Sequence, residues 1–192
     1  MKNENKDIQL VVFLDRDGVI NKFPGRGEYV KNWKEFEFLP GVFEALKALK
    51  EKGAKIFIIS NQAGVGKGIY SQKDLELITE NMLKELRSEG IELDGVFYCT
   101  HSPEENCECR KPKTRLLERA VQSLGEVKIL RKIFIGDSIR DIKTARNFGC
   151  IGILVLSGQE SLENKSQWEI EPDFVFKDLK AAVNFILNSF FD

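Results

Sequence analysis

Two acidic side chains two positions apart, Asp15 and Asp17, follow an apolar run near the start of the chain. The run, residues 10–14, has the composition of a buried parallel strand, and Gly18 lets the chain turn after the acids. In an open α/β sheet, ligands bind at the carboxyl ends of the strands, so both carboxylates would face a binding crevice. Because neighbouring carboxylates repel, the pair indicates a bound cation or a retained proton. An ordinary Asp-Gly turn is the simpler alternative.

A third acid ends a later strand in the same way. Asp137 closes the run 132–137, and Asp141 follows shortly after it. If the sheet is doubly wound, Asp137 converges on one crevice with Asp15 and Asp17. Three carboxylates around one point need a divalent cation, and oxygen ligands favour Mg²⁺ over zinc. The sequence therefore predicts a magnesium site at this edge of the sheet.

A hydroxyl and a lysine would complete a phosphate site. Ser60 ends the strand-like run 54–60, and Lys111 lies just before an expected helix. The ligand that best suits these groups is a phosphoryl group, since the metal and Lys111 would neutralise its charge and the Ser60 hydroxyl would bind one of its oxygens. Taken singly, Ser60 could be a turn residue, Lys111 a solvated cation and Asp137 a helix N-cap.

The types and order of these residues resemble the motifs of the haloacid-dehalogenase (HAD) superfamily of phosphohydrolases. The matching segments are DRDGVIN after the first strand, then SNQ, CRKP and GDSIRD. The resemblance implies that Asp15 is the nucleophile, which forms an aspartyl-phosphate. It implies that Asp17 is the general acid for the leaving group and then the base for the attacking water. Ser60 and Lys111 would hold the phosphoryl oxygens.

The same resemblance implies the metal ligands and the core architecture. Mg²⁺ would be bound by Asp15, by Asp137 and by the backbone carbonyl of Asp17, with Asp141 supporting these ligands. The core would be Rossmann-like. Four segments in the right order, each near a strand end, would be an improbable coincidence.

A second cluster, independent of the first, spans residues 99–109, CTHSPEENCEC. It contains three cysteines and the single histidine of the chain: Cys99, His101, Cys107 and Cys109. Such ligands form a closed tetrahedral set that suits structural Zn²⁺, with a solvent loop or a disulfide as alternatives. Because the cluster leads directly to Lys111, zinc would stiffen the loop that aims this cation. Cys150, outside the cluster, is expected in the core.

The zinc pattern narrows the resemblance. CxH followed by CxCRKP resembles the D-glycero-D-manno-heptose 1,7-bisphosphate phosphatases and the related histidinol-phosphate phosphatases. Segments 29–42, 60–75 and 93–99 are similar to the heptose enzymes. Two features depart from that pattern. The loop between Asn21 and Tyr29 is longer, and the short zinc spacer resembles the histidinol-phosphate enzymes.

Substrate recognition would fall to loops. The resemblance to the heptose enzymes implies that Arg110 contacts the substrate, and we expect Asn61 and Gln62 to do so as well. Loop 22–30 is a candidate for contacting the leaving sugar, because no large cap insertion is visible.

The expected function is Mg²⁺-dependent hydrolysis of a small phosphorylated metabolite through an aspartyl-phosphate. The expected bond is the C7 phosphate ester of D-glycero-D-manno-heptose 1,7-bisphosphate, and hydrolysis of histidinol phosphate is the alternative. A phospho-acceptor switch is an alternative of another class. Asp17 argues against a switch, because an acid two residues after the acceptor would hasten its dephosphorylation.

Alternating strand-like and helix-like segments must position these side chains. The expected strands are 10–14, 54–60, 95–99, 132–137, 152–156 and 174–176, and the expected helices are 41–53, 71–89, 115–125, 141–150 and 178–191. Ser71 and Asp74 are a plausible capping pair for the longest helix. This alternation predicts a doubly wound, mostly parallel α/β sheet. We expect one domain over residues 1–192, without a large cap domain.

Composition excludes several partner classes. The chain of 192 residues has 29 Lys and Arg and 30 Asp and Glu, which gives a net charge of -1. It therefore lacks the excess of positive charge that would attract nucleic acid or anionic membranes. No apolar run approaches the roughly 20 residues of a membrane span, and the polar start, MKNENKDIQ, is unlike a signal peptide. We therefore expect a cytoplasmic protein, monomeric by default.

Overall fold

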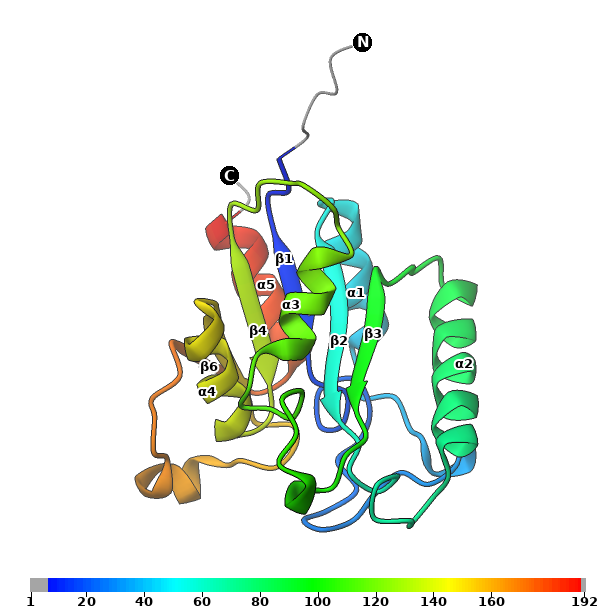
Figure 1. The fold of residues 1–192 in the computed structure, drawn as a ribbon. Coiled ribbons are helices and arrows are strands. Elements are labelled where there is room, and N and C mark those ends of the chain that lie inside the picture. The colour runs from blue at the N-terminus through cyan, green and yellow to red at the C-terminus, as the bar shows by residue number, and fades with distance from the viewer. Residues whose placement is uncertain (1–6, 191–192) are drawn as a thin grey trace.

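Six parallel strands form one sheet in the computed structural model, which describes residues 7–190 (Figure 1). The strands are β1 (Val11–Leu14), β2 (Lys55–Asn61), β3 (Gly95–Cys99), β4 (Lys132–Gly136), β5 (Ile151–Val155) and β6 (Phe174–Phe176). Their spatial order is β3-β2-β1-β4-β5-β6, and every neighbouring pair is parallel. The order reverses between β1 and β4, which is where doubly wound sheets open a ligand crevice.

Five α-helices cover the two faces of this sheet. They are α1 (Val42–Glu51), α2 (Gln72–Ser88), α3 (Arg115–Gln122), α4 (Ile139–Phe148) and α5 (Leu179–Phe190). Figure 1 shows α3 and α4 in front of the sheet, with α1 and α5 behind it. Ile78, Met82 and Leu86 of α2 belong to the same core as the buried residues of α1 and α5, so helices cover both faces. The predicted doubly wound architecture is confirmed.

Strand β1 shows why its sequence is apolar without interruption. Successive side chains of a strand point to opposite faces, and this strand is covered on both. Val12 and Leu14 enter the core beneath α1 and α5, whereas Val11 and Phe13 enter the core beneath α3. All four side chains are fully buried. The central strand that carries the acids at its end is therefore held firmly.

The predicted elements all occur, with shifts at their ends. The capping box of Ser71 and Asp74 is present in α2. Helix α4 begins at Ile139, before the expected start at Asp141, because Ser138 is its N-cap. The Ser138 backbone N–H and hydroxyl both donate hydrogen bonds to the Asp141 carboxylate. Three short 3₁₀ helices were not predicted from the sequence: η1 (Trp33–Glu35), η2 (Pro103–Glu105) and η3 (Leu162–Gln167). The end of the last predicted helix, Phe191, lies outside the described residues.

None of the helices between residues 7 and 190 combines the length and the apolar character that crossing a bilayer demands.

Asp94 joins the start of β3 to its neighbours and should give the fold a pH-dependent stability. Its carboxylate accepts hydrogen bonds from Lys50 Nζ (2.8 Å), Lys55 Nζ (2.9 Å) and the Ile56 backbone N–H (2.8 Å). Burial alone would raise the pKa of Asp94, but these donors outweigh it and hold the pKa below its usual value. The stabilisation is therefore present above the unfolded-state pKa and is lost as pH falls through the folded-state value.

We expect Asp94→Asn to lower the free energy of unfolding at pH 7 by about 1–2 kcal/mol. The difference from wild type should shrink at pH 3, as urea unfolding at both pH values would show. Glu92→Gln, at an exposed carboxyl two residues away, should change stability by less than about 0.5 kcal/mol. An equal loss at both pH values would contradict the role given to the Asp94 charge.

Candidate active site

A cavity of about 360 Å³ lies where the predicted site residues meet. Asp15 and Asp17 reach it from the end of β1, Ser60 from β2 and Asp137 from the end of β4, and Lys111 enters from the loop before α3. Loop residues 23–29, Asn61, Arg110, Arg140 and Gln159 also contribute to its lining. Residues separated by more than 120 positions thus surround one space, as the doubly wound topology requires.

Three carboxylates in this cavity form a group that suits a cation. One oxygen each of Asp15, Asp137 and Asp141 lie within 4.8 Å of one another. Burial raises the pKa of Asp137 well above its usual value, and the nearby Asp15 and Asp141 raise it further. Burial also raises the pKa of Asp15, against the effect of Lys111. A hard divalent cation would relieve this repulsion, so the donor set fits Mg²⁺.

Two glycines leave the space that the Asp137 carboxylate occupies. A Cβ at Gly18 or at Gly158 would overlap that carboxylate. Gly18 also has a φ of 85°, a backbone conformation that residues other than glycine rarely adopt. The carboxylate accepts a hydrogen bond from the Gln159 backbone N–H at 2.8 Å. The turns after β1 and β5 are therefore shaped around this carboxylate.

Lys111 is the buried cation of the site. Its side chain is 2% exposed, and its Nζ lies 3.1 Å from Asp15 Oδ1 and 2.6 Å from Asp141 Oδ1. Burial would lower the pKa of Lys111, but the charges of Asp141 and Asp15 outweigh it and raise the pKa. The lysine therefore carries its proton at neutral pH and can neutralise an anion beside Asp15.

Asn61 holds the main chain of Lys111. Its Oδ1 accepts from the Lys111 backbone N–H (3.0 Å), and its Nδ2 donates to the Lys111 carbonyl (3.3 Å). Both ends of the amide are therefore engaged, although Asn61 lines the cavity. Arg110 also lines the cavity, and its Nη1 is buried without a hydrogen-bond partner among residues 7–190. Arg110 is thus better placed than Asn61 for the expected substrate contact.

Gln62 is not placed to make the substrate contact expected from the sequence. It is 1% exposed and lies outside the cavity lining. Its Nε2 donates to Asp17 Oδ2 at 2.8 Å and to the Ser60 hydroxyl oxygen at 3.1 Å. The sequence places both Asn61 and Gln62 at a strand end, but it does not say which side chain faces the crevice. The structure places the Gln62 side chain in the interior, outside the cavity lining.

Arg16, between the two acids, was not predicted as a functional residue. It is fully buried, and its guanidinium donates to Asp17 at 3.0 Å. Its position in the sequence could have indicated this role. A cation that directly follows a buried apolar strand needs a charged partner, and Arg16 lies between two acids. Asp17 lines the cavity, but its side chain lies outside the group of three carboxylates.

The cluster of residues 99–109 also comes together. The Sγ atoms of Cys99, Cys107 and Cys109 lie 3.0–3.5 Å apart, and His101 Nδ1 lies 3.2 Å from Cys109 Sγ. These separations exceed the roughly 2.05 Å of a disulfide bond, and all three cysteines are free thiols. Four N and S ligands around one point fit Zn²⁺. Cys150 is separate and buried in the core, as predicted.

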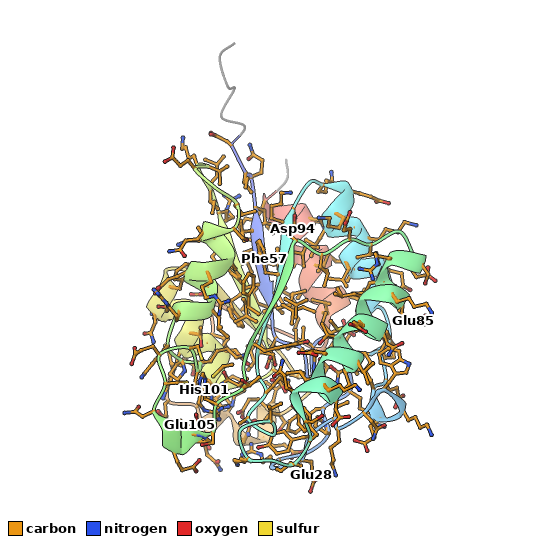
Figure 2. All side chains as sticks on the ribbon, turned by 45° about the vertical axis from the view of Figure 1, so that its right-hand side comes forward. Glu28, Phe57, Glu85, Asp94, His101 and Glu105 are labelled. Atoms are coloured by element: carbon orange, nitrogen blue, oxygen red, sulfur yellow. The ribbon has the colours of Figure 1, made fainter. Side chains whose placement is uncertain are left out.

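The cluster of residues 99–109 borders the active-site loops. The Gln62 backbone N–H donates to the Cys99 carbonyl at 2.7 Å, and the Gly66 N–H donates to the Thr100 carbonyl at 2.9 Å. Figure 2 shows His101 at the same end of the molecule as Glu28, which lines the cavity, with Asp94 at the opposite end. A metal here would brace the chain that leads into Arg110 and Lys111.

Fold and site together define a phosphatase of the HAD class. The HAD-hydrolase-like family model matches residues 108–182. A D-glycero-beta-D-manno-heptose-1,7-bisphosphate 7-phosphatase of Helicobacter pylori J99 is 39% identical over 91% of this chain and 95% of the relative. A D-glycero-alpha-D-manno-heptose-1,7-bisphosphate 7-phosphatase of Mycobacterium bovis is 39% identical over 77% of each chain.

A solved structure agrees with these relatives. The D,D-heptose 1,7-bisphosphate phosphatase from B. bronchiseptica, complexed with magnesium and phosphate, superposes with a TM-score of 0.84. It is 30% identical and covers 93% of this chain and 98% of its own. The chain belongs to the D-glycero-D-manno-heptose-1,7-bisphosphate 7-phosphatase family. The resemblance found in the sequence is confirmed, and the chain is an enzyme rather than a phospho-acceptor switch.

Proposed function

We propose that this chain hydrolyses the C7 phosphate ester of D-glycero-D-manno-heptose 1,7-bisphosphate. The observation that carries the proposal is the cavity in which Asp15, Lys111 and the carboxylate group meet, in a chain of this family. A relative named for the β anomer and one named for the α anomer are each 39% identical, over 91% and 77% of this chain. The phosphate at C7 is common to both names.

The first step transfers the phosphoryl group to the protein. An Asp15 carboxylate oxygen attacks phosphorus, and the bond from phosphorus to the sugar oxygen breaks. The electron pair of that bond stays on the sugar oxygen, which takes a proton from Asp17. Lys111 and the Ser60 hydroxyl hold the phosphoryl oxygens on which negative charge develops. The ion pair between Lys111 and Asp15 already places this cation beside the nucleophile.

The second step releases phosphate. Asp17, now deprotonated, takes a proton from a water molecule as the water oxygen attacks phosphorus. The bond from phosphorus to the Asp15 oxygen breaks, and its electron pair restores the Asp15 carboxylate. Inorganic phosphate leaves, and Asp17 again holds the proton needed for the next turnover.

Asp15, Asp137 and the backbone carbonyl of Asp17 would hold Mg²⁺. Asp141 lies beside these ligands and pairs with Lys111, so it helps to hold the lysine next to Asp15. The bound ion supplies charge neutralisation to the phosphoryl group. Magnesium and phosphate occur together in the related B. bronchiseptica structure.

Arginines at the mouth of the cavity suit the second phosphate of a bisphosphate. Arg26 comes from the long loop after β1, and Arg140 from the start of α4. Both are exposed and line the cavity together with Arg110. A second phosphate bound by these guanidiniums would orient the sugar so that its C7 end faces Asp15.

We expect Arg26→Ala to raise the KM for the bisphosphate about tenfold with little change in kcat, because it removes one charge-assisted contact. Steady-state kinetics would show this split. The KM for p-nitrophenyl phosphate, which has a single phosphate, should stay within a factor of two. An equal rise in KM for both substrates would contradict a contact with the second phosphate.

We also propose that Cys99, His101, Cys107 and Cys109 bind one structural Zn²⁺. Cys109→Ser should remove most of this metal and, by loosening the loop that carries Lys111, lower kcat about tenfold. Metal analysis of the purified protein, in parallel with phosphate release, would measure both effects. Cys150→Ala is the matched control and should retain zinc. Full zinc retention by Cys109→Ser would contradict the ligand set.

We further propose that the protein is a cytoplasmic monomer that acts on a small sugar phosphate. The cluster thiols persist in a reducing compartment, which supports the cytoplasm. Light scattering of the purified chain would test the monomer, with a mass near 21.9 kDa expected.

The test of the proposed reaction is ³¹P NMR of the bisphosphate incubated with the enzyme and Mg²⁺. We expect the C7 phosphate signal to be replaced by inorganic phosphate while the C1 signal remains. Loss of the C1 signal first would overturn the assignment of the bond that breaks.

A further inference from the structure

A buried chain of hydrogen bonds ends on Asp17, and the two steps above make no use of it. The Tyr70 hydroxyl donates to Gln62 Oε1 at 2.6 Å, and Gln62 Nε2 donates to Asp17 Oδ2 at 2.8 Å. The same Nε2 donates to the Ser60 hydroxyl oxygen at 3.1 Å. One amide therefore connects the acid–base carboxylate with the hydroxyl that holds the phosphoryl group.

The orientation of the Gln62 amide is fixed by its partners. Its Oε1 receives the Tyr70 hydroxyl and Arg16 Nη2, the latter at 3.1 Å. A guanidinium can only donate, so the amide oxygen must face Arg16 and the nitrogen must face Asp17. Burial raises the pKa of Tyr70, so its hydroxyl also remains a donor. Gln62 is thus locked as a donor to the carboxylate.

The Asp17 carboxylate receives protein donors on both oxygens. Oδ1 accepts from Asn21 Nδ2 at 2.9 Å and from Arg16 Nη2 at 3.0 Å. Oδ2 accepts from Gln62 Nε2 and, at 3.1 Å, from Arg16 Nη2. The side chain is 19% exposed and lines the cavity. Asp17 is thus held by buried protein donors while its carboxylate still borders the cavity, where a leaving group would lie.

Arg16 makes this arrangement rigid. It is 0% exposed, and its guanidinium lies 6.0 Å from the Phe36 ring and 5.7 Å from the Tyr98 ring. Its carboxylate partner among residues 7–190 is Asp17. A buried guanidinium is costly unless it is paired, so Arg16 and Asp17 hold each other in place.

We propose that Gln62, fixed by Tyr70 and Arg16, is a positioning residue for the general acid. It holds Asp17 so that the proton is delivered toward the cavity, onto the oxygen that leaves with the sugar. This inference rests on the proposed function. It gives Gln62 a role in positioning Asp17 instead of the substrate contact expected from the sequence.

The proposal predicts a dependence on the leaving group that a purely structural role would not produce. A sugar oxygen is a poor leaving group and must be protonated as the bond breaks. p-Nitrophenolate leaves without a proton, so a misplaced Asp17 should scarcely affect its release. The ratio kcat/KM reports the steps up to leaving-group release and is insensitive to hydrolysis of the aspartyl-phosphate.

The experiment compares kcat/KM for the heptose bisphosphate and for p-nitrophenyl phosphate in wild type, Gln62→Met and Tyr70→Phe. We expect Gln62→Met to lower the value about 100-fold for the bisphosphate and less than about threefold for the aryl phosphate. Tyr70→Phe, which removes one hydroxyl, should give about a fivefold loss in the same direction and tests the proposal if Gln62→Met fails to fold. Gln72→Met, an exposed glutamine on α2, should match wild type.

Equal losses on both substrates in Gln62→Met and Tyr70→Phe would overturn the positioning role and leave the proposed function intact. Wild-type enzyme that hydrolyses neither substrate would overturn the proposed function itself.

Discussion

Asp15→Asn should reduce phosphate release at least about 10⁴-fold, because a carboxamide does not attack phosphorus and no aspartyl-phosphate can form. The substitution is nearly isosteric. An amide oxygen can still accept the Arg16 backbone N–H, which donates to Asp15 Oδ1 at 2.7 Å in the structure. Phosphate release measured with saturating Mg²⁺ and bisphosphate would test this. Residual activity above about 1% of wild type would contradict the nucleophile assignment.

The stability of the same variant separates chemistry from folding. The pKa of Asp15 is raised by burial, which means that its charge costs folding free energy in the absence of metal. Asp15→Asn should therefore melt at or above the wild-type temperature without Mg²⁺. Added Mg²⁺ should raise the melting temperature of wild type more than that of the variant. A lower melting temperature for Asp15→Asn would show that the charge stabilises the fold.

Lys111→Met should lower kcat about 10³-fold, because the variant loses the cation beside the transferring phosphoryl group. It also leaves Asp15 and Asp141 without their buried partner, so the free energy of unfolding should fall by about 3 kcal/mol without metal. Phosphate release and urea unfolding, with and without Mg²⁺, would measure the two effects. Part of the stability should return with Mg²⁺, which replaces the missing positive charge.

Lys73→Met, an exposed lysine on α2, is the matched control and should leave kcat and stability unchanged. Unaltered kcat in Lys111→Met would exclude a contact between this lysine and the phosphoryl group. Unaltered stability would mean that the acids around Lys111 are protonated in the folded chain.

The sheet could be predicted because its strands are buried on both faces. Val11 to Leu14 are continuously apolar for that reason, and the acids that follow them stand out against this background. Once the strands are placed, parallel topology alone brings Asp15 and Asp137 to one edge, which the cavity bears out. The Cys/His cluster could be found because three cysteines and the single histidine of the chain occur within eleven positions.

The finer geometry of the site depends on contacts between distant segments. The pairing of Lys111 with Asp141 spans 30 positions, and the same ammonium donates to the Ile59 carbonyl of β2, so its place depends on how α4 and β2 pack together. The buried Arg16 and the inward direction of Gln62 depend on neighbouring rings and amides that no local pattern contains. Sequence spacing indicates which residues reach the crevice, whereas packing decides which of them face the substrate.

The most direct test of the central claim is the ratio of kcat/KM for heptose 1,7-bisphosphate to that for histidinol phosphate, measured in parallel with Mg²⁺ and with Asp15→Asn as the blank. We expect a preference for the bisphosphate of at least about 100-fold, since the second phosphate can bind the arginines at the cavity mouth. Equal values, or a preference for histidinol phosphate, would contradict the proposed substrate.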